Sequence, residues 1–229
     1  YMSLAQIDVQ RGDYQSGLEH INRSLCRNWD NLKGRQLKAS ILRKTGEVEA
    51  AESLIRESLE MDKFNAGCRF EAYLLSKGRA DEREKRDAFL HIMRGFVHNF
   101  IEYSLDFAAA GLYDEAEEMM LMYTSDVVNA YPVSFYCLGY YASQKGDSAK
   151  AKEYFKKAAE CDPAYCFPNR IEEVVMMQKA LEFIPDDAKT NYYLGNFHYY
   201  ARFYDKALSY WEKSLQKDDT FPTVLRNLA

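Results

Sequence analysis

Residues 138–163 read LGYYASQKGDSAKAKEYFKKAAECDP and contain the pattern that decides the fold. A turn signal at residues 146–148 stands in the middle, with Gly139 seven positions before it and Ala151 five positions after it. Small side chains at such positions let two antiparallel helices approach closely while their larger neighbours interdigitate. This stretch therefore predicts a helix, a tight turn and a second helix.

The same three markers recur along the whole chain. Turn signals begin at residues 12, 46, 111, 146 and 202, so their spacings are 34, 65, 35 and 56 residues, and only the last has lost its glycine. The small residues before and after the turns keep these spacings; Ala5 and Gly17 are the first such pair, and Gly195 and Ala207 are the last. Three markers in one phase indicate a repeat, and each long gap holds one further, irregular unit.

The residues between the turns favour helix throughout. Only five prolines are present, and good helix formers fill the intervals. We therefore predict an all-α protein, an α-solenoid of antiparallel helix pairs that runs as a single solenoid over residues 1–229. The first and last units look incomplete, which indicates a fragment of a longer protein. The expected units are 1–31 (partial), 32–65, 66–96 (irregular), 97–131, 132–165, 166–187 (a lone helix), 188–221 and 222–229 (the start of a further helix).

The repeat unit resembles the tetratricopeptide repeat. The pattern of that family is Leu-Gly, then Tyr, then Ala-x-x-x-Phe, then Pro, and the residues here that match it are Leu138, Gly139, Ala151, Phe155 and Pro163. The unit at 188–221 matches less completely, because His198 replaces the usual Tyr and Asp219 the usual Pro. The resemblance implies that the α-solenoid is a right-handed superhelix of stacked helix pairs.

The C-terminal third has a further resemblance. The segments 166–170, 192–196 and 221–229 look like parts of a group of bacterial repeat proteins. That group couples such arrays to an upstream domain of unknown function, thought to be similar to sugar-handling β-sandwiches. The resemblance implies a possible link to glycans, but it names no chemistry.

Composition argues against several classes of function. Thirty basic residues stand against 35 acidic ones, giving a net charge of −5, whereas nucleic-acid binding would be expected to show as a basic domain or stripe. No stretch approaches 18 consecutive apolar residues, so we expect no membrane insertion. The five cysteines are odd in number and too sparse for a disulfide framework. This favours reduced thiols and a cytoplasmic location.

The sequence offers no pattern for catalysis, a metal or a cofactor. The four histidines are scattered, without a His-Glu-x-x-His or Cys-x-x-Cys arrangement, and no glycine-rich phosphate loop is present. The segment SLQK at 214–217 matches the Ser-x-x-Lys of certain acyl-enzymes, but it lacks their companion motifs. His198 falls in a slot between helices, where we expect a structural role. We therefore expect a protein that is not an enzyme.

A partner is expected on the first helices of the pairs, because these line the concave face of such a superhelix. In the last full unit Leu194, Gly195 and His198 are expected to face the second helix, so the opposite stripe is expected to open to solvent. The candidate partner-binding residues are Tyr136, Tyr140, Gln144, Lys189, Tyr192, Asn196, Tyr199 and Tyr200. The same phase predicts a basic stripe farther back, comprising Lys33, Gln36, Ser40, Arg43 and Lys44.

A tyrosine-rich and partly basic groove suits an extended, somewhat acidic peptide, or a partner domain. The leading hypothesis is therefore a non-catalytic protein-interaction scaffold. Two alternatives remain open, namely a carbohydrate-associated accessory module whose tyrosines stack on sugar rings, and an oligomerisation spacer that pairs through its exposed ends. A packing role for the same tyrosines, with their rings buried between repeats, competes with all three.

Overall fold

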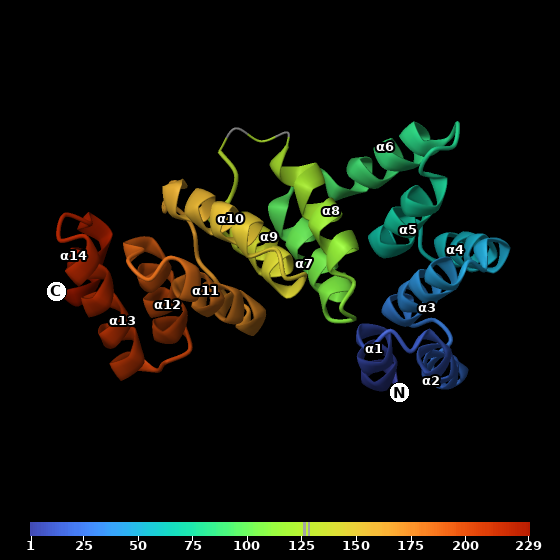
Figure 1. Cartoon of the computed structure of the whole chain (residues 1–229), viewed down its shortest axis with the longest axis horizontal. Coiled ribbons are helices and arrows are strands. Elements are labelled where there is room, and N and C mark those ends of the chain that lie inside the picture. The colour runs from blue at the N-terminus through green and yellow to red at the C-terminus, as the bar shows by residue number, and fades with distance from the viewer. Residues whose placement is uncertain (126, 128) are drawn as a thin grey trace. The chain divides into compact units, whose positions relative to one another are not determined.

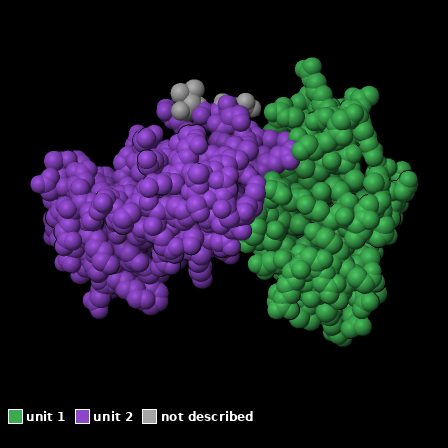
Figure 2. Space-filling model, in the orientation of Figure 1, with its two compact units in different colours: residues 1–116 green, residues 117–229 purple. Residues whose placement is uncertain are grey.

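The computed structural model describes residues 1–125, 127 and 129–229. In this part of the chain there are fourteen α-helices and no strand, which confirms the predicted all-α class. The chain divides into two compact units, residues 1–116 and residues 117–229 (Figure 2). No helix among the described residues is both long and apolar enough to cross a membrane.

Unit 1 is a series of helical hairpins that pack side by side in chain order (Figure 1). Its helices are α1 (Met2–Gln10), α2 (Tyr14–Arg27), α3 (Leu32–Thr45), α4 (Val48–Met61), α5 (Ala66–Ser76), α6 (Glu82–Met93), α7 (Val97–Ala108) and the start of α8 (Tyr113–Thr124). Asparagine and aspartate begin several of them; Asp13, for example, accepts a hydrogen bond from the backbone N–H of Ser16 at 3.0 Å. Such caps satisfy N–H groups that the helix itself leaves unpaired.

Unit 2 continues with the same kind of hairpin and one extra helix. Its helices after α8 are α9 (Pro132–Gln144), α10 (Ser148–Glu160), α11 (Ile171–Phe183), α12 (Ala188–Tyr200), α13 (Tyr204–Lys217) and α14 (Pro222–Leu228). The unpaired helix α11 packs on α9, α10 and α12, and the Phe183 ring lies 5.4 Å from the Phe155 ring of α10.

Glycines at the hairpin contacts explain the repeat pattern. A Cβ atom at Gly139 would lie 2.4 Å from the Phe155 ring, and one at Gly195 would lie 2.3 Å from Trp211. A larger residue at either position would therefore push the two helices apart. The aromatic side chain of the second helix fills the space that the glycine leaves on the first.

In unit 1 the fourth hairpin returns to the first two. A Cβ atom at Gly111, in the turn between α7 and α8, would lie 3.0 Å from the Cα of Gln10 at the end of α1. Phe107 of α7 also packs edge-on against Phe70 of α5 at 5.4 Å. Between α1, α3 and α7 there is a cavity of only about 10 Å³, room for one water molecule at most. The inner faces of these helices are thus covered by one another.

Candidate functional site

The eight candidate residues of unit 2 differ in solvent exposure, and two of them are buried. Tyr136 is fully buried, and its hydroxyl lies 2.7 Å from the Thr190 hydroxyl of α12. Tyr192 is buried against Phe221, with ring centroids 4.9 Å apart. The expected open stripe is therefore covered at these two positions, because α12 packs over one tyrosine and the turn before α14 packs over the other.

Burial also changes the acidity of the Tyr136 hydroxyl. Removal from water raises its pKa well above the ordinary value, and the nearby Asp187 carboxylate raises it further. The hydroxyl is therefore a neutral hydrogen-bond donor within the core of unit 2.

On α9 the other two candidates lie nearer to solvent. Gln144 is exposed at the end of the helix, and Tyr140 is half-buried with its ring edge-on to Tyr141 at 6.3 Å. These two residues are accessible to a partner, whereas Tyr136 one turn earlier is not.

Lys189 and Asn196 are used largely within unit 2. The Lys189 ammonium donates a hydrogen bond to the backbone oxygen of Cys161 at 2.7 Å. The Asn196 side-chain oxygen accepts hydrogen bonds from Trp211 Nε1 and Asn227 Nδ2, both at 3.2 Å. Its amide nitrogen is buried without a hydrogen-bond partner among the described residues. Both side chains therefore help to hold neighbouring helices, and both are half-buried.

The most exposed candidates form part of an aromatic patch at the turn between α12 and α13. We define the patch as Tyr199, Tyr200, Phe203 and Tyr204, whose exposed fractions are 56%, 76%, 57% and 53%. The ring of Tyr199 lies 5.4 Å from both Trp211 and Tyr204, so it is held in place although half of it faces solvent. Large apolar side chains that gather on a surface commonly mark an interaction site.

Two residues of the aromatic patch, Phe203 and Tyr204, are absent from the sequence-based candidates. The available signal was the turn at 202–204, where Arg202 replaces the usual glycine and two aromatics follow. Two cations lie beside the patch. Arg202 is exposed in the turn, and the Lys206 ammonium lies 5.4 Å from the Phe203 ring centroid. The patch therefore combines aromatic surface with positive charge.

The basic stripe predicted for unit 1 is neutralised. Arg43 pairs with Glu71 at 2.7 Å and with Glu115 at 2.9 Å, and Lys44 pairs with Glu115 at 2.6 Å. Lys33 pairs with Asp106 at 2.8 Å. The carboxylates come from α5, α7 and α8, far along the chain, so this stripe offers little free positive charge to a ligand.

Burial and ion pairing shift the pKa values of these carboxylates in opposite directions. Burial by itself would raise the pKa of Glu115, but the Lys44 hydrogen bond and the Arg43 charge outweigh it and lower the pKa below the ordinary value. For Asp106 burial dominates over the Lys33 interaction, and the pKa is raised. The remaining polar members of the stripe, Gln36 and Ser40, are buried.

His198 lies in the core of the α12–α13 hairpin, as its position predicts. Its ring stacks on Tyr210 with centroids 5.3 Å apart, and burial lowers its pKa, which favours the neutral ring. Within the described part of the chain, no group of three or more His, Cys, Asp or Glu side chains could hold a metal ion.

Comparison with known proteins identifies the repeat. A family model described as tetratricopeptide repeat matches residues 32–65 and 134–165. No curated protein matches the chain.

Several solved structures are similar to this chain at low sequence identity. The MamA protein is 16% identical, covering 70% of this chain and 88% of its own, with a TM-score of 0.37. The C-terminal part of a TPR repeat-containing protein from Cytophaga hutchinsonii is 14% identical over 100% of both chains, with a TM-score of 0.36. A tetratricopeptide repeat protein from Parabacteroides merdae is 14% identical, covering 98% of this chain and 94% of its own, with a TM-score of 0.36.

Proposed function

We propose, from the tetratricopeptide repeats that this chain contains, that it is a non-catalytic scaffold that binds a protein partner through unit 2. Stacked helical repeats present extended surfaces that are suited to protein recognition. The observation that carries the proposal is the aromatic patch, in which four large rings are each more than half exposed. An extended, somewhat acidic peptide or a partner domain fits this surface.

The aromatic patch is built from side chains that brace one another. Tyr199 is braced by Trp211 and Tyr204, so little side-chain freedom is lost when a partner covers it. Tyrosine combines a large apolar ring with a hydroxyl that remains hydrogen-bonded, and anchor residues at interfaces are enriched in it. Arg202 and Lys206 add positive charge beside the rings, which favours a ligand that carries carboxylates.

Within unit 1 the first helices are less suited to the same role. Their polar stripe is occupied by ion pairs, and the space between α1, α3 and α7 is filled. This contrast is why the proposal places the partner on unit 2.

A sugar-binding platform made of Tyr192 and Tyr199 receives no support. The burial of Tyr192 against Phe221 leaves its face unavailable for stacking on a sugar ring. The protein-binding proposal needs only residues that are exposed.

The proposal is tested by affinity capture from the source cells with the whole chain as bait, followed by quantitative mass spectrometry. The double variant Tyr199→Ala/Tyr200→Ala is expected to lose the captured partner, because each anchor contributes about 1–3 kcal/mol to such an interface. Tyr165→Ala/Phe167→Ala removes two exposed aromatics from another part of unit 2 and serves as the matched control. Equal recovery of the partner with the wild type and both variants, or equal loss of the partner with both variants, would contradict a role for the patch.

A further inference from the structure

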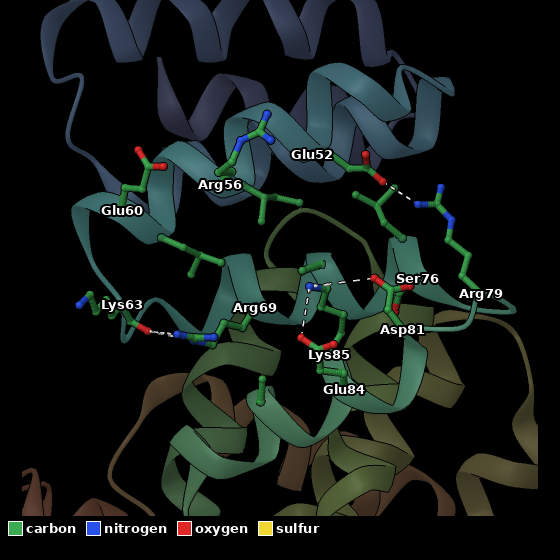
Figure 3. Close-up of a pocket in the computed structure, with 15 residues that line it drawn as sticks. Glu52, Arg56, Glu60, Lys63, Arg69, Ser76, Arg79, Asp81, Glu84 and Lys85 are labelled. Atoms are coloured by element: carbon green, nitrogen blue, oxygen red, sulfur yellow. Dashed lines mark hydrogen bonds and ion pairs between the residues drawn. The ribbon is translucent and has the colours of Figure 1, made fainter.

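A second surface feature lies in unit 1, on helices that the proposal above does not use. A groove of about 740 Å³ runs between α4 and α6, with α5 as its floor (Figure 3). Its apolar lining consists of Ile55, Leu59, Ala72, Leu75 and Ala88. Leu59, Ala72 and Leu75 are only half-buried, so apolar surface remains accessible there.

The groove exists because α6 directs its large apolar side chains elsewhere. Phe89 packs against Phe70 of α5 at 5.1 Å and against Phe100 of α7 at 6.1 Å. What α6 presents to the groove is the small Ala88 together with charged residues of its first turns. Alanine at positions 72 and 88 leaves the space between the flanking helices unfilled.

Charge is distributed unequally along the groove. At the end near the α4–α5 loop lie Lys63 and Arg69, together with Glu60, whereas Arg56 lies midway along α4 (Figure 3). In the described part of the chain neither Arg56 nor Lys63 pairs with a carboxylate, and Arg69 donates only to the backbone oxygen of Lys63, at 2.7 and 2.9 Å. Among the described residues, this end therefore has two cations, Lys63 and Arg69, that form no ion pair, beside the single carboxylate of Glu60.

The opposite end is already paired. Arg79 forms an ion pair with Glu52 at 2.6 Å, and Lys85 lies 4.0 Å from Asp81 and 3.9 Å from Glu84 (Figure 3). A ligand therefore meets unpaired cations at one end, apolar surface in the middle, and balanced charge at the other end.

We infer that this groove binds an amphipathic helix of a partner protein, with an apolar face and with Asp or Glu at the end that meets Lys63 and Arg69. Two helical walls above a helical floor are the setting in which a further helix packs, at interaxial distances of about 8–10 Å. Between Glu52 and Glu60, α4 rises about 12 Å, which matches roughly two turns of bound helix. Carboxylates of the ligand gain charge-assisted hydrogen bonds from the Lys63 ammonium and the Arg69 guanidinium.

This site differs from the aromatic patch in unit, lining and ligand, so either can fail without the other. The groove selects an acidic helix through apolar contact and unpaired cations, whereas the patch offers exposed rings. A variant of the patch, Tyr199→Ala/Tyr200→Ala, is therefore expected to leave binding at the groove unchanged.

The test is fluorescence anisotropy on the whole chain with a labelled peptide of about 18 residues, long enough to form a helix when bound. The peptide carries leucines at helical spacing and glutamates beside them. A second peptide has lysine in place of glutamate, and a third has the first composition with a proline in its centre. We expect the glutamate peptide to bind at least about tenfold more tightly than either of the others.

Two variants of the chain locate the binding. Lys63→Glu/Arg69→Glu reverses the charge at the cationic end of the groove and is expected to weaken binding of the glutamate peptide by at least about tenfold. Ala72→Leu fills the floor of the groove and is also expected to weaken binding of the glutamate peptide. Circular dichroism checks that this variant folds. Lys152→Glu/Lys156→Glu makes the same charge change at exposed positions of α10 and is expected to change affinity little.

Several results would overturn the inference. Equal affinity for the glutamate and lysine peptides would remove the role of charge, and equal affinity for the proline peptide would show that an extended acidic chain suffices. Affinity that survives the double charge reversal, or that falls equally in the α10 control, would place binding elsewhere. Weakening confined to the groove variants supports the inference.

Discussion

Units 1 and 2 use the same helical hairpin but join their hairpins by different chemistry. In unit 1 a long-range set of ion pairs ties α3 to α5, α7 and the start of α8, with Arg43 and Glu115 separated by 72 residues in sequence. In unit 2, α9 holds Tyr136 at the repeat position that Gln36 occupies in α3, and Tyr136 bonds to Thr190 and packs on Tyr193 of α12. Ion pairs therefore hold the distant helices of unit 1 together, whereas aromatic packing holds neighbouring helices of unit 2 together.

The difference also separates the two candidate binding surfaces. The inner stripe of unit 1 is used in that unit's own ion pairs, whereas Lys63 at the α4–α6 groove forms no ion pair in the described part of the chain. Unit 2 buries Tyr136 and Tyr192 but leaves Tyr199, Tyr200 and Tyr204 exposed at the α12–α13 turn.

The largest effect is expected from Glu71→Ala in unit 1. Glu71 is fully buried and accepts hydrogen bonds from Arg43 and Ser40, so its removal leaves a mostly buried guanidinium short of a partner. We expect a loss of about 3–5 kcal/mol in the free energy of unfolding, measured in urea with hydrogen exchange of α3 and α5 as the local readout. Glu52→Ala, which breaks an ion pair with Arg79 in which both side chains are exposed, should cost about 0–1 kcal/mol. Similar losses in the two variants would refute a special role for the buried charges.

A smaller effect on the same ion pairs is expected from acid. The pKa of Glu115 in the folded chain lies below its ordinary value of 4.5, so folding favours the ionised form. Its contribution to stability is complete above pH 4.5 and is lost as the pH falls through the folded pKa. The measurement is the unfolding free energy of wild type and Glu115→Gln across this range. The wild type should show the steeper decline, and parallel curves would contradict the assignment.

In unit 2 the matching change is Tyr136→Phe. Thr190 donates its hydroxyl hydrogen to Asp187, so Tyr136 is the donor to Thr190. Removing this hydrogen bond while keeping the ring should cost about 1 kcal/mol in urea unfolding. Tyr200→Phe, at an exposed position, should change stability by no measurable amount. A cost above that of Glu71→Ala would reverse the comparison between the units.

The smallest effect concerns the hairpin turns. Gly46 of unit 1 has φ +83°, whereas Arg202 holds the equivalent left-handed position in unit 2 with φ +64°. Because this region strains a residue with a side chain, Arg202→Gly should raise stability by about 0.5–1 kcal/mol, seen as a higher Tm. Gly46→Arg should lower it, and a lower Tm for Arg202→Gly would show that the arginine has a contact worth more than the strain.

Local sequence was sufficient to predict the fold class and the repeat. The contacts of Gly139 with Phe155 and of Gly195 with Trp211 lie within single hairpins, so their spacing is written in consecutive residues. The lone helix expected within residues 166–187 is similarly bounded by local turn signals, and α11 spans Ile171–Phe183.

The surface could not be predicted in the same way, because burial depends on helices that are distant in sequence. Nothing in the residues around Tyr136 shows that α12 will cover it, 54 residues later. Likewise the local sequence predicts Arg43 to be a free cation, because its partners Glu71 and Glu115 come from helices distant in sequence. The same limit explains why Tyr199 and Tyr192, on one helix, have opposite exposures.

The return of the fourth hairpin to the first in unit 1 has a consequence for folding. An open array of repeats behaves as a one-dimensional chain, in which each unit depends only on its nearest neighbours and the ends can unravel stepwise. Contacts such as those of Gly111 with Gln10, and of Arg43 with Glu115, link distant members of the series. Deleting α1 and α2 should therefore destabilise α7 as well as α3, and unit 1 should melt cooperatively where a simple array would fray from its end.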